Sequence, residues 1–512
     1  MKTAVRLLAI IGAFTAFVPT PIAQLHGQAS YDLLFRNGRI FDGTGAPWYR
    51  ADSVRSLFFL SMAQTPQPDW VKIEEETMHH FQAILRFDTS NPPGNEVLVV
   101  DYLKDVLNGE GIETKVFALD PQRPNLVARL HGNGKKRPVL IMGHTDVVTV
   151  DPAKWKHPPF SATREGGYVY GRGTLDDKPS VAAGLMTMLQ LKRMKIPLDR
   201  DVIFLAEASE EGNGPYGINF MVERHWAEIE AEYCFAEGGS VVRRGGKIQY
   251  AAVATTEKIA HTVKLIARGV AGHGSVPLRS NAIVHLSQAV AKVASWQTPM
   301  RLNETTRAYF ERMTKLSAPE DAARYQIILR QTDTHAVQEY FATNLPRLHS
   351  MLRTSISPNI IKGGYLRNVI PSEAEATLDI RALPDEDMPA LLEQLRKVIN
   401  DPAIEVVRIT SAATRPGAQP SRLDTEAFQV LEAAHRRIYN TVALPTMLTG
   451  GTDMAQVRAR GVPCYGVGPM TDIEDGPKGF GPHSDQERIL EEALHRFVRF
   501  HLDIVVNLAK TN

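Results

Sequence analysis

The feature that most constrains this chain is a series of short apolar runs that end beside histidine or acidic residues. Strand-like runs cover residues 125–130, 139–142, 202–206 and 233–236, and helical periodicity such as that of residues 179–194 lies between them. Strands that alternate with helices predict an α/β sheet with helices on both faces. Ligands of such sheets gather beyond the carboxyl ends of the strands. Polar side chains are therefore expected to meet at one edge of the sheet.

Five histidine and acidic residues follow these runs or lie in later loops: His144, Asp176, Glu211, Glu237 and His483. Carboxylate oxygen and neutral imidazole nitrogen are the ligands that hard or borderline divalent metals take. Two metals about 3.5–4 Å apart need one shared ligand and capping ligands on each side. Each residue alone is typical of a surface loop or turn, but their joint placement predicts a metal pair.

Two further acidic residues complete this pattern. Glu210 precedes Glu211, so one carboxylate of the pair remains to act as a general base. Asp146 lies two residues beyond His144. It can accept a hydrogen bond from the imidazole and fix its tautomer. Residues that hydrogen-bond a metal-binding histidine usually have this role.

The size and composition of the chain limit the other possibilities. Its 512 residues are too many for one core and predict two or more domains. A net charge of +1 gives no electrostatic indication of a nucleic-acid or membrane partner. The two cysteines, Cys234 and Cys464, exclude a disulfide scaffold and a cysteine-rich zinc site. One disulfide between them stays open.

The N-terminus is typical of an export signal. Lys2 and Arg6 precede an apolar stretch over residues 7–18, and the small residues Ala23 and Ala29 follow. The apolar stretch is short for a membrane span, so we expect no stable membrane anchor. Residues 1–29 are therefore predicted to be a signal peptide of an exported protein, periplasmic or secreted. An uncleaved interfacial helix is the alternative.

Residues 30–69 are predicted to be an appendage and linker. Residues 31–45 resemble the opening strands of amidohydrolase-type deacylases, which next require a His-X-His pair for metal. None of the 16 histidines forms such a pair. The catalytic unit is therefore expected to begin near residue 70.

A second αβ pattern interrupts the first. Residues 257–412 contain predicted strands at 261–267, 374–380 and 404–409, helices at 281–295 and 387–400, and a charged helical insert at 297–355. Two strand–helix–strand passages predict a small α+β sandwich. The chain then returns through a helix at 428–439, a strand at 464–467 and a final helix at 486–509. The first domain would thus comprise residues 70–256 and 413–512.

Five motifs, taken in order, resemble those of the M20 metallopeptidase family. They lie at residues 142–146, 171–178, 208–212, 236–239 and 481–485. This family contains aminoacylases, carboxypeptidases and succinyl-diaminopimelate desuccinylases. The run at 237–239, the long insert and residues 449–453 are most similar to the carboxypeptidase S-like and N-fatty-acyl amino acid hydrolase branch. The resemblance covers residues 70–512 and implies a zinc-peptidase αβα catalytic domain with an inserted lid domain that can mediate homodimerisation.

The resemblance implies a role for each member of the predicted metal site. His144 and Glu237 would hold one metal, Glu211 and His483 the other, and Asp176 would bridge them. Glu210 would be the general base, and Asp146 would orient His144. The family usually uses two zinc ions per subunit, although this set of oxygen and nitrogen ligands also accepts manganese or cobalt.

The resemblance also implies substrate contacts. His273 would polarise the scissile carbonyl and is often supplied across a dimer. Asn368 and Arg381 match positions in the lid that bind a substrate carboxylate, although Arg381 could equally be part of a surface ion pair. The loop of Gly450, Gly451 and Thr452 would line the substrate pocket.

The expected function is that of an exported dinuclear-zinc hydrolase. Its substrate would be a peptide or an N-acyl amino acid with a free carboxylate, and water would attack the amide bond. Two alternatives stay open, an amidohydrolase-type deacylase suggested by residues 31–52 and a non-catalytic metal-binding protein.

Overall fold

The computed structural model describes residues 33–40, 49–55, 68–212, 214–410 and 415–511. The chain divides into two compact units, Met1–Gln67 and Pro68–Asn512. In the first unit, β1 (Leu33–Ile40) and β2 (Tyr49–Arg55) form an antiparallel hairpin. The predicted signal peptide at residues 1–29 lies outside the described residues.

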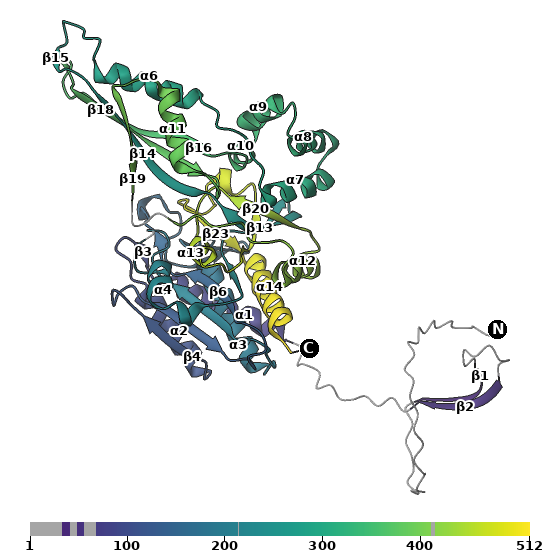
Figure 1. Ribbon diagram of the computed structural model, residues 1–512. Helices are drawn as coiled ribbons and strands as arrows, with labels where there is room; N and C mark the ends of the chain where they lie inside the picture. The colour runs from purple at the N-terminus through teal and green to yellow at the C-terminus, as the bar shows by residue number, and fades with distance from the viewer. Residues whose placement is uncertain (1–32, 41–48, 56–67, 213, 411–414, 512) are drawn as a thin grey trace. The chain divides into compact units, whose positions relative to one another are not determined.

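A ten-stranded mixed sheet forms the centre of the second unit (Figure 1). In the middle of the sheet, β6 lies between β10 and β11, and all three strands are parallel. The edges are partly antiparallel, since β5 pairs antiparallel with both β10 and β4. The path runs β22 (Met470–Asp472), β12 (Ser240–Arg244), β13 (Lys247–Glu257), β21 (Cys464–Gly466), β11 (Tyr233–Ala236), β6 (Val139–His144), β10 (Val202–Glu207), β5 (Asn125–Leu130) and β4 (Glu113–Phe117), with β20 (Ala443–Leu448) paired to β13.

Helices cover both faces of this sheet. Val139 and Ile141 of β6 belong to one buried cluster, whereas Leu140 and Met142 belong to another. Such alternation is expected when a strand is buried on both sides. The first cluster includes α1 (Trp70–Leu85), α2 (Val97–Gly109), α3 (Lys178–Arg193), α12 (Glu426–Tyr439) and α14 (Glu491–Ala509), and the second includes α4 (Ile218–Arg224), α5 (Trp226–Ile229) and α13 (Met454–Ala459).

A four-stranded antiparallel sheet is inserted between β13 and α12. Its order is β16 (Ser355–Gly363), β18 (Glu373–Ala382), β14 (Ile259–Arg268) and β19 (Ile404–Ile409). The helices α6 (Ala282–Ser295) and α11 (Met388–Ile399) share its buried core. A two-stranded sheet of β15 (Gly272–His273) and β17 (Val369–Ile370) lies at its far tip (Figure 1). The predicted α/β class with an inserted smaller unit is thus confirmed.

The predicted helical insert forms four helices beside the central sheet. They are α7 (Glu304–Leu316), α8 (Pro319–Arg330), α9 (His335–Asn344) and α10 (Pro346–Met351). A capping box explains where α7 begins, because the side chains of Asn303 and Thr306 satisfy each other's backbone N–H groups. Leu444 and Met447 of β20 belong to the core of these helices. The insert therefore packs on the central sheet as well as adjoining the smaller one.

The structure corrects the start of the last helix. The predicted helix at 486–509 begins only at Glu491, because β23 (Arg488–Leu490) pairs with β9 (Tyr168–Tyr170), which in turn pairs with β8 (Thr163–Glu165). The open question of a disulfide is also answered, since Cys234 and Cys464 are buried free thiols on the paired strands β11 and β21. Among the described residues, no helix has both the length and the apolar character that crossing a membrane requires.

Candidate metal centre

His144 ends β6 and is almost completely buried. Its Nδ1 lies 3.0 Å from the backbone carbonyl oxygen of Asp146 and 3.3 Å from the Oδ1 of the same residue. Its Nε2 lies 3.0 Å from Oδ1 of Asp176. In the tautomer in which Nδ1–H donates to Asp146, Nε2 carries a free lone pair on the side of Asp176. A histidine that binds a metal through Nε2 needs this tautomer.

The two oxygens of Asp176 face different histidines. Oδ1 is the atom next to His144, whereas Oδ2 lies 3.1 Å from Nε2 of His483. The same Nε2 lies 3.0 Å from Oε1 of Glu211. One carboxylate thus spans two imidazoles that are distant in sequence, and the second imidazole has a further carboxylate beside it.

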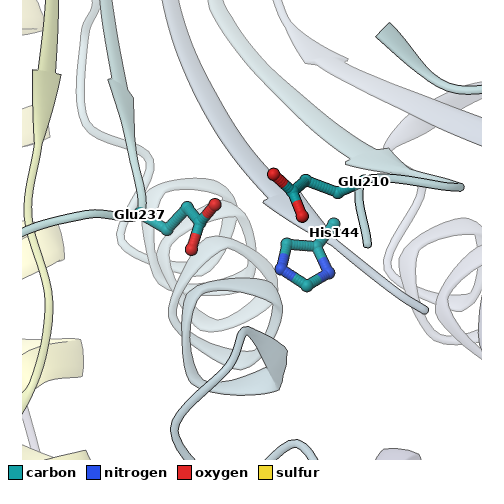
Figure 2. Close-up of side chains that lie close together, drawn as sticks. All are labelled: His144, Glu210 and Glu237. Carbon is teal, nitrogen blue, oxygen red and sulfur yellow. The ribbon is translucent and has the colours of Figure 1, made fainter. Parts of the chain in front are cut away.

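Glu210 and Glu237 approach His144 from other elements. Figure 2 shows their carboxylates converging on the imidazole, with Glu237 entering just after β11 and Glu210 from the loop after β10. Ligand atoms of these three residues lie within 4.8 Å of one another, and the same holds for His144, Asp176 and Glu211. All five predicted ligands and the predicted base therefore lie in one neighbourhood, with His144 in both groups.

Asp146 holds the loop that carries the two glutamates. Its Oδ1 accepts a hydrogen bond from the backbone N–H of Glu210 at 3.1 Å, and its Oδ2 accepts one from that of Glu211 at 3.2 Å. Asn91 donates to the same Oδ2 at 2.7 Å. Just before the pair, Ser209 has a φ of 66°, so a left-handed turn lets neighbouring carboxylates enter one site. Asp146 therefore does more than contact His144.

Glu487, which the sequence did not indicate, holds the loop of the bridging aspartate. Its Oε1 accepts from the backbone N–H groups of Leu175 at 2.7 Å and Asp176 at 3.3 Å. Its Oε2 accepts from Arg172 at 2.7 Å and from the N–H of Gly173 at 3.2 Å. Glu487 is fully buried. No local signal marks it, because these partners lie more than 300 positions earlier in the chain.

Burial and the crowding of acids shift the pKa values in this site. Burial raises the pKa of Glu237 well above its usual value, and Asp176 and Glu210 add to this effect. Burial also raises the pKa of Glu210 to about 8, against the opposing charge of Arg415. Hydrogen bonds to Asp176 and Glu211 raise the pKa of His483 to about 10. Burial would lower the pKa of His144, yet its acidic neighbours raise it well above its usual value.

These residues fit a pair of divalent cations. Seven buried or half-buried acids surround two imidazoles, so the protein alone leaves negative charge poorly compensated: Asp146, Asp176, Asp177, Glu207, Glu210, Glu211 and Glu237. Among the described residues, Oδ2 of Asp177 and Oε2 of Glu207 are buried without a hydrogen-bond partner. Buried carboxylates are costly unless they are paired or coordinate a metal. The oxygen and nitrogen donors also match zinc, manganese or cobalt.

Arg415 lies directly behind Glu210 and is a second residue that the sequence did not indicate. Its Nη2 donates to Oε1 of Glu210 and lies 3.2 Å from Oδ1 of Asp453. The predicted loop of Gly450, Gly451 and Thr452 adjoins this group. A Cβ on Gly451 would lie 3.1 Å from Cδ of Arg415, and Gly450 has open space around it. The hydroxyl of Thr452 donates to Glu257 at 2.8 Å.

Two of the three predicted lid residues lie apart from the metal site. His273 and Asn368 are neighbours at the tip of the smaller sheet, where the carbonyl of Asn368 accepts from the N–H of Gly274 at 2.8 Å. Arg381 lies near the other end of β18 and pairs with Asp379 at 3.0 Å. In Figure 1 the tip with β15 is remote from β6. Within one chain, the structure therefore does not bring His273 or Asn368 to the metal site.

A cavity of about 420 Å³ opens onto the metal site. Asp176 and Glu237 line it, together with Gly238, Met470 and Arg488. Neither the lid residues nor residues 450–452 are part of its lining. The volume falls in the range of sites for small molecules, so a compact substrate fits beside the cluster.

Comparisons with known proteins agree with this geometry. The probable carboxypeptidase S-like 2 of Dictyostelium discoideum is 31% identical over 328 residues, which are 62% of this chain and 62% of that protein. The N-fatty-acyl-amino acid synthase/hydrolase of Xenopus tropicalis is 28% identical over 378 residues, 72% of each chain. The crystal structure of an M20 family metallo-carboxypeptidase from Sulfolobus solfataricus shares the fold, with a TM-score of 0.64 at 18% identity, covering 85% of this chain and 99% of that one.

The aligned part of the chain thus spans less than two thirds of the first of these relatives. The match to the family itself is broader. Residues 140–507 match the peptidase family M20/M25/M40, and this range includes all five predicted ligand motifs completely. The chain therefore belongs to peptidase family M20, a family of hydrolytic enzymes that act on amide bonds.

Proposed function

We propose that this protein is an exported dinuclear-zinc hydrolase that cleaves the amide bond of a peptide or an N-acyl amino acid bearing a free carboxylate. The observation that carries the proposal is the split contact of Asp176, whose two oxygens face His144 and His483. This geometry suits a carboxylate that bridges two ions. His144 and Glu237 would hold one ion, and Glu211 and His483 the other.

The chemistry divides between the ions and the chain. Bound divalent ions lower the pKa of a water molecule toward neutrality and polarise a carbonyl group. Glu210 accepts the proton that the attacking water loses and later donates it to the leaving amine nitrogen. Glu210 is placed for both transfers, because its carboxylate lies within reach of His144 and Glu237.

The remaining residues position this machinery. Asp146 orients His144 and holds the backbone of Glu210 and Glu211. The proposed carbonyl contact of His273 requires the lid tip of a second copy, because His273 lies far from the metal site within one chain. Asn368 and Arg381 would bind the substrate carboxylate, for which arginine provides bidentate geometry.

The non-catalytic alternative is disfavoured by Glu210. A protein that only binds metal needs no additional buried carboxylate beside a complete ligand set, yet Glu210 lies within reach of His144 and Glu237. The deacylase alternative rests on residues 31–52. Deleting residues 30–60 should leave hydrolysis intact if the site resides in Pro68–Asn512.

The test of the proposed function is Glu210→Gln. We expect turnover of an N-acyl amino acid and dipeptide panel to fall by about 10²–10⁴-fold, the usual contribution of a general base. Metal analysis should still find near two ions per chain. Glu223→Gln, at an exposed glutamate on α4, is the matched control. Unchanged turnover in Glu210→Gln, or chelator-resistant activity in the parent protein, would refute the mechanism.

A further inference from the structure

His483 is the most exposed of the five predicted ligands. Its side chain is 51% exposed, against 7% for Glu211 and 1% for His144. Asp146 contacts Nδ1 of His144, whereas Nδ1 of His483 has no hydrogen-bond partner among the described residues. The direction of the His483 imidazole therefore depends on the backbone that carries it.

That backbone has an unusual conformation. His483 has a φ of 61°, in the left-handed region that few residues other than glycine adopt. Ser484 closes a turn around it, because its hydroxyl donates to the carbonyl of Gly481 at 2.6 Å and its N–H donates to the same oxygen at 3.2 Å. Such a conformation persists only where the surrounding structure fixes it. The segment between β22 and β23, residues 473–487, must therefore be anchored near His483.

Arg488, the first residue of β23, provides this anchor. Its Nε and Nη2 donate to the two oxygens of Asp475, at 3.2 Å and 2.7 Å, so the ion pair has two prongs. Its Nη1 donates to the hydroxyl of Tyr170 at 3.1 Å. Its guanidinium carbon lies 3.9 Å from the ring centroid of Tyr168 and 3.9 Å from that of Phe480. The guanidinium thus joins the segment to the small sheet that β8, β9 and β23 form.

Backbone hydrogen bonds complete the anchor. The N–H of Phe480 donates to the carbonyl of Asp475 at 2.9 Å, and the N–H of Arg488 donates to the carbonyl of Phe480 at 3.3 Å. A two-pronged pair between arginine and carboxylate fixes orientation as well as adding energy, and contact with aromatic rings strengthens it. The pair is also shielded from water, since Arg488 is 15% exposed and Asp475 is 16% exposed. Residues 475–480, which end three positions before His483, are therefore held as one piece.

The neighbour of Arg488 in the chain supports another ligand. Glu487 accepts from the backbone N–H of Asp176, the bridging aspartate. Neighbouring side chains of an extended segment point to opposite sides. The start of β23 can therefore hold two ligands at once, Asp176 through Glu487 and His483 through Arg488.

We propose that Arg488 is a positioning residue for His483 and thereby sets the affinity of the ion that Glu211 and His483 hold. The inference rests on the pair of ions in the proposed function. Arg488 acts through the backbone of residues 475–480 and is not itself a ligand. The ion at His144 and Glu237 is independent of Arg488, because these two ligands are carried by β6 and β11 of the central sheet.

The test is the binding of Zn²⁺ to chelator-stripped protein, measured by competition with a chromophoric chelator. The parent protein should bind two ions, with one dissociation constant for each. In Arg488→Gln one constant should rise about 10–100-fold, as expected for the loss of a residue that orients a ligand, and the other should change less than about threefold. His483→Ala should raise the same constant. Adding Arg488→Gln to His483→Ala should then have no further effect, because Arg488 acts through His483.

Two further variants test the contact between Arg488 and Asp475. Asp475→Asn removes the same ion pair from its other side, so it should give the same selective loss, and the two changes together should lose no more than either alone. Arg488→Lys keeps the charge but loses the two-pronged geometry and the planar contact with the rings, so it should restore the affinity only in part. These two variants carry the test if Arg488→Gln does not fold.

Arg129→Gln is the matched control. Arg129 pairs with Asp201 at a similar exposure, 17% and 20%, and Asp201 precedes the end of β10 that is opposite the metal site. This variant should leave both constants unchanged. Unchanged constants in Arg488→Gln, equal rises of both constants, or the same rise in Arg129→Gln would overturn the role of Arg488 and leave the pair of ions standing. A parent protein that binds a single ion, with an affinity that His483→Ala does not alter, would instead refute the proposed pair and this inference with it.

Discussion

The buried carboxylate of Glu487 provides a quantitative test of how the metal site is supported. Glu487→Gln keeps the size of the side chain but removes its charge. Arg172, of which 2% is exposed, would lose its anion, and the N–H groups of Gly173, Leu175 and Asp176 would compete for one amide oxygen. Breaking a buried ion pair from one side costs about 3–5 kcal/mol. We expect a loss of unfolding free energy of that size.

The measurement is urea unfolding of chelator-treated protein, so that metal binding does not contribute to stability. The control is Glu492→Gln, because Glu492 is 59% exposed and its pair with Arg496 should contribute less than about 0.5 kcal/mol. The Asp176 loop should also loosen in Glu487→Gln. Metal affinity is then expected to fall about 10–100-fold, which is the usual effect of mutating a residue that positions a metal ligand. A stability loss below about 1 kcal/mol with unchanged metal affinity would refute this role of Glu487.

Three further predictions concern acid stability, backbone packing and the base. Burial lowers the pKa of His501 to about 3, so below pH 6.5 the unfolded chain binds the proton before the folded one does. The free energy of unfolding should therefore fall by about 2 kcal/mol between pH 6.5 and 5. Urea unfolding of His501→Leu should lose about 2 kcal/mol less over this range, and identical pH profiles for the two proteins would contradict the prediction. Gly217→Ala places a Cβ 1.8 Å from the carbonyl oxygen of Ala208 and should cost about 1–3 kcal/mol in urea unfolding, whereas Gly109→Ala, with no neighbour within 4 Å, should cost nothing measurable. The charge of Arg415 lowers the pKa of Glu210, so Arg415→Gln should move the acidic limb of the pH profile of kcat to higher pH. An acidic limb at the same pH in both proteins would show that Arg415 does not set the pKa of Glu210.

Much of the fold could be predicted because the decisive signals are local. Apolar runs with turn residues at their ends gave the bounds of β5 and β11, and periodicity gave α3 to within one residue. The start of α14 was wrong because Arg488–Leu490 is taken up by pairing with β9, more than 300 positions earlier. A helical pattern in sequence carries no information about such a distant strand.

The same difference between local and long-range signals separates the site residues that could be predicted from those that could not. The predicted ligands follow strands or stand in short motifs, and the structure brings His144, Asp176, Glu211, Glu237 and His483 together. Their individual roles as ligands stay predictions until metal is observed. Residues that support them, such as Glu487 and Arg415, could not be found, because each is defined only by contacts made across the folded chain. The roles of His273 and Asn368 stay predictions for a related reason, since their partners would lie on a second copy. The role of Arg381 stays a prediction because the structure pairs it with Asp379.

The most direct test of the metal pair is an anomalous-diffraction map of crystals of the protein. The account predicts two peaks about 3.5–4 Å apart on either side of the Asp176 carboxylate. One peak should lie beside His144 and Glu237, and the other beside Glu211 and His483. A single peak, or none within reach of Asp176 in crystals of active protein, would contradict the claim that this carboxylate bridges two ions.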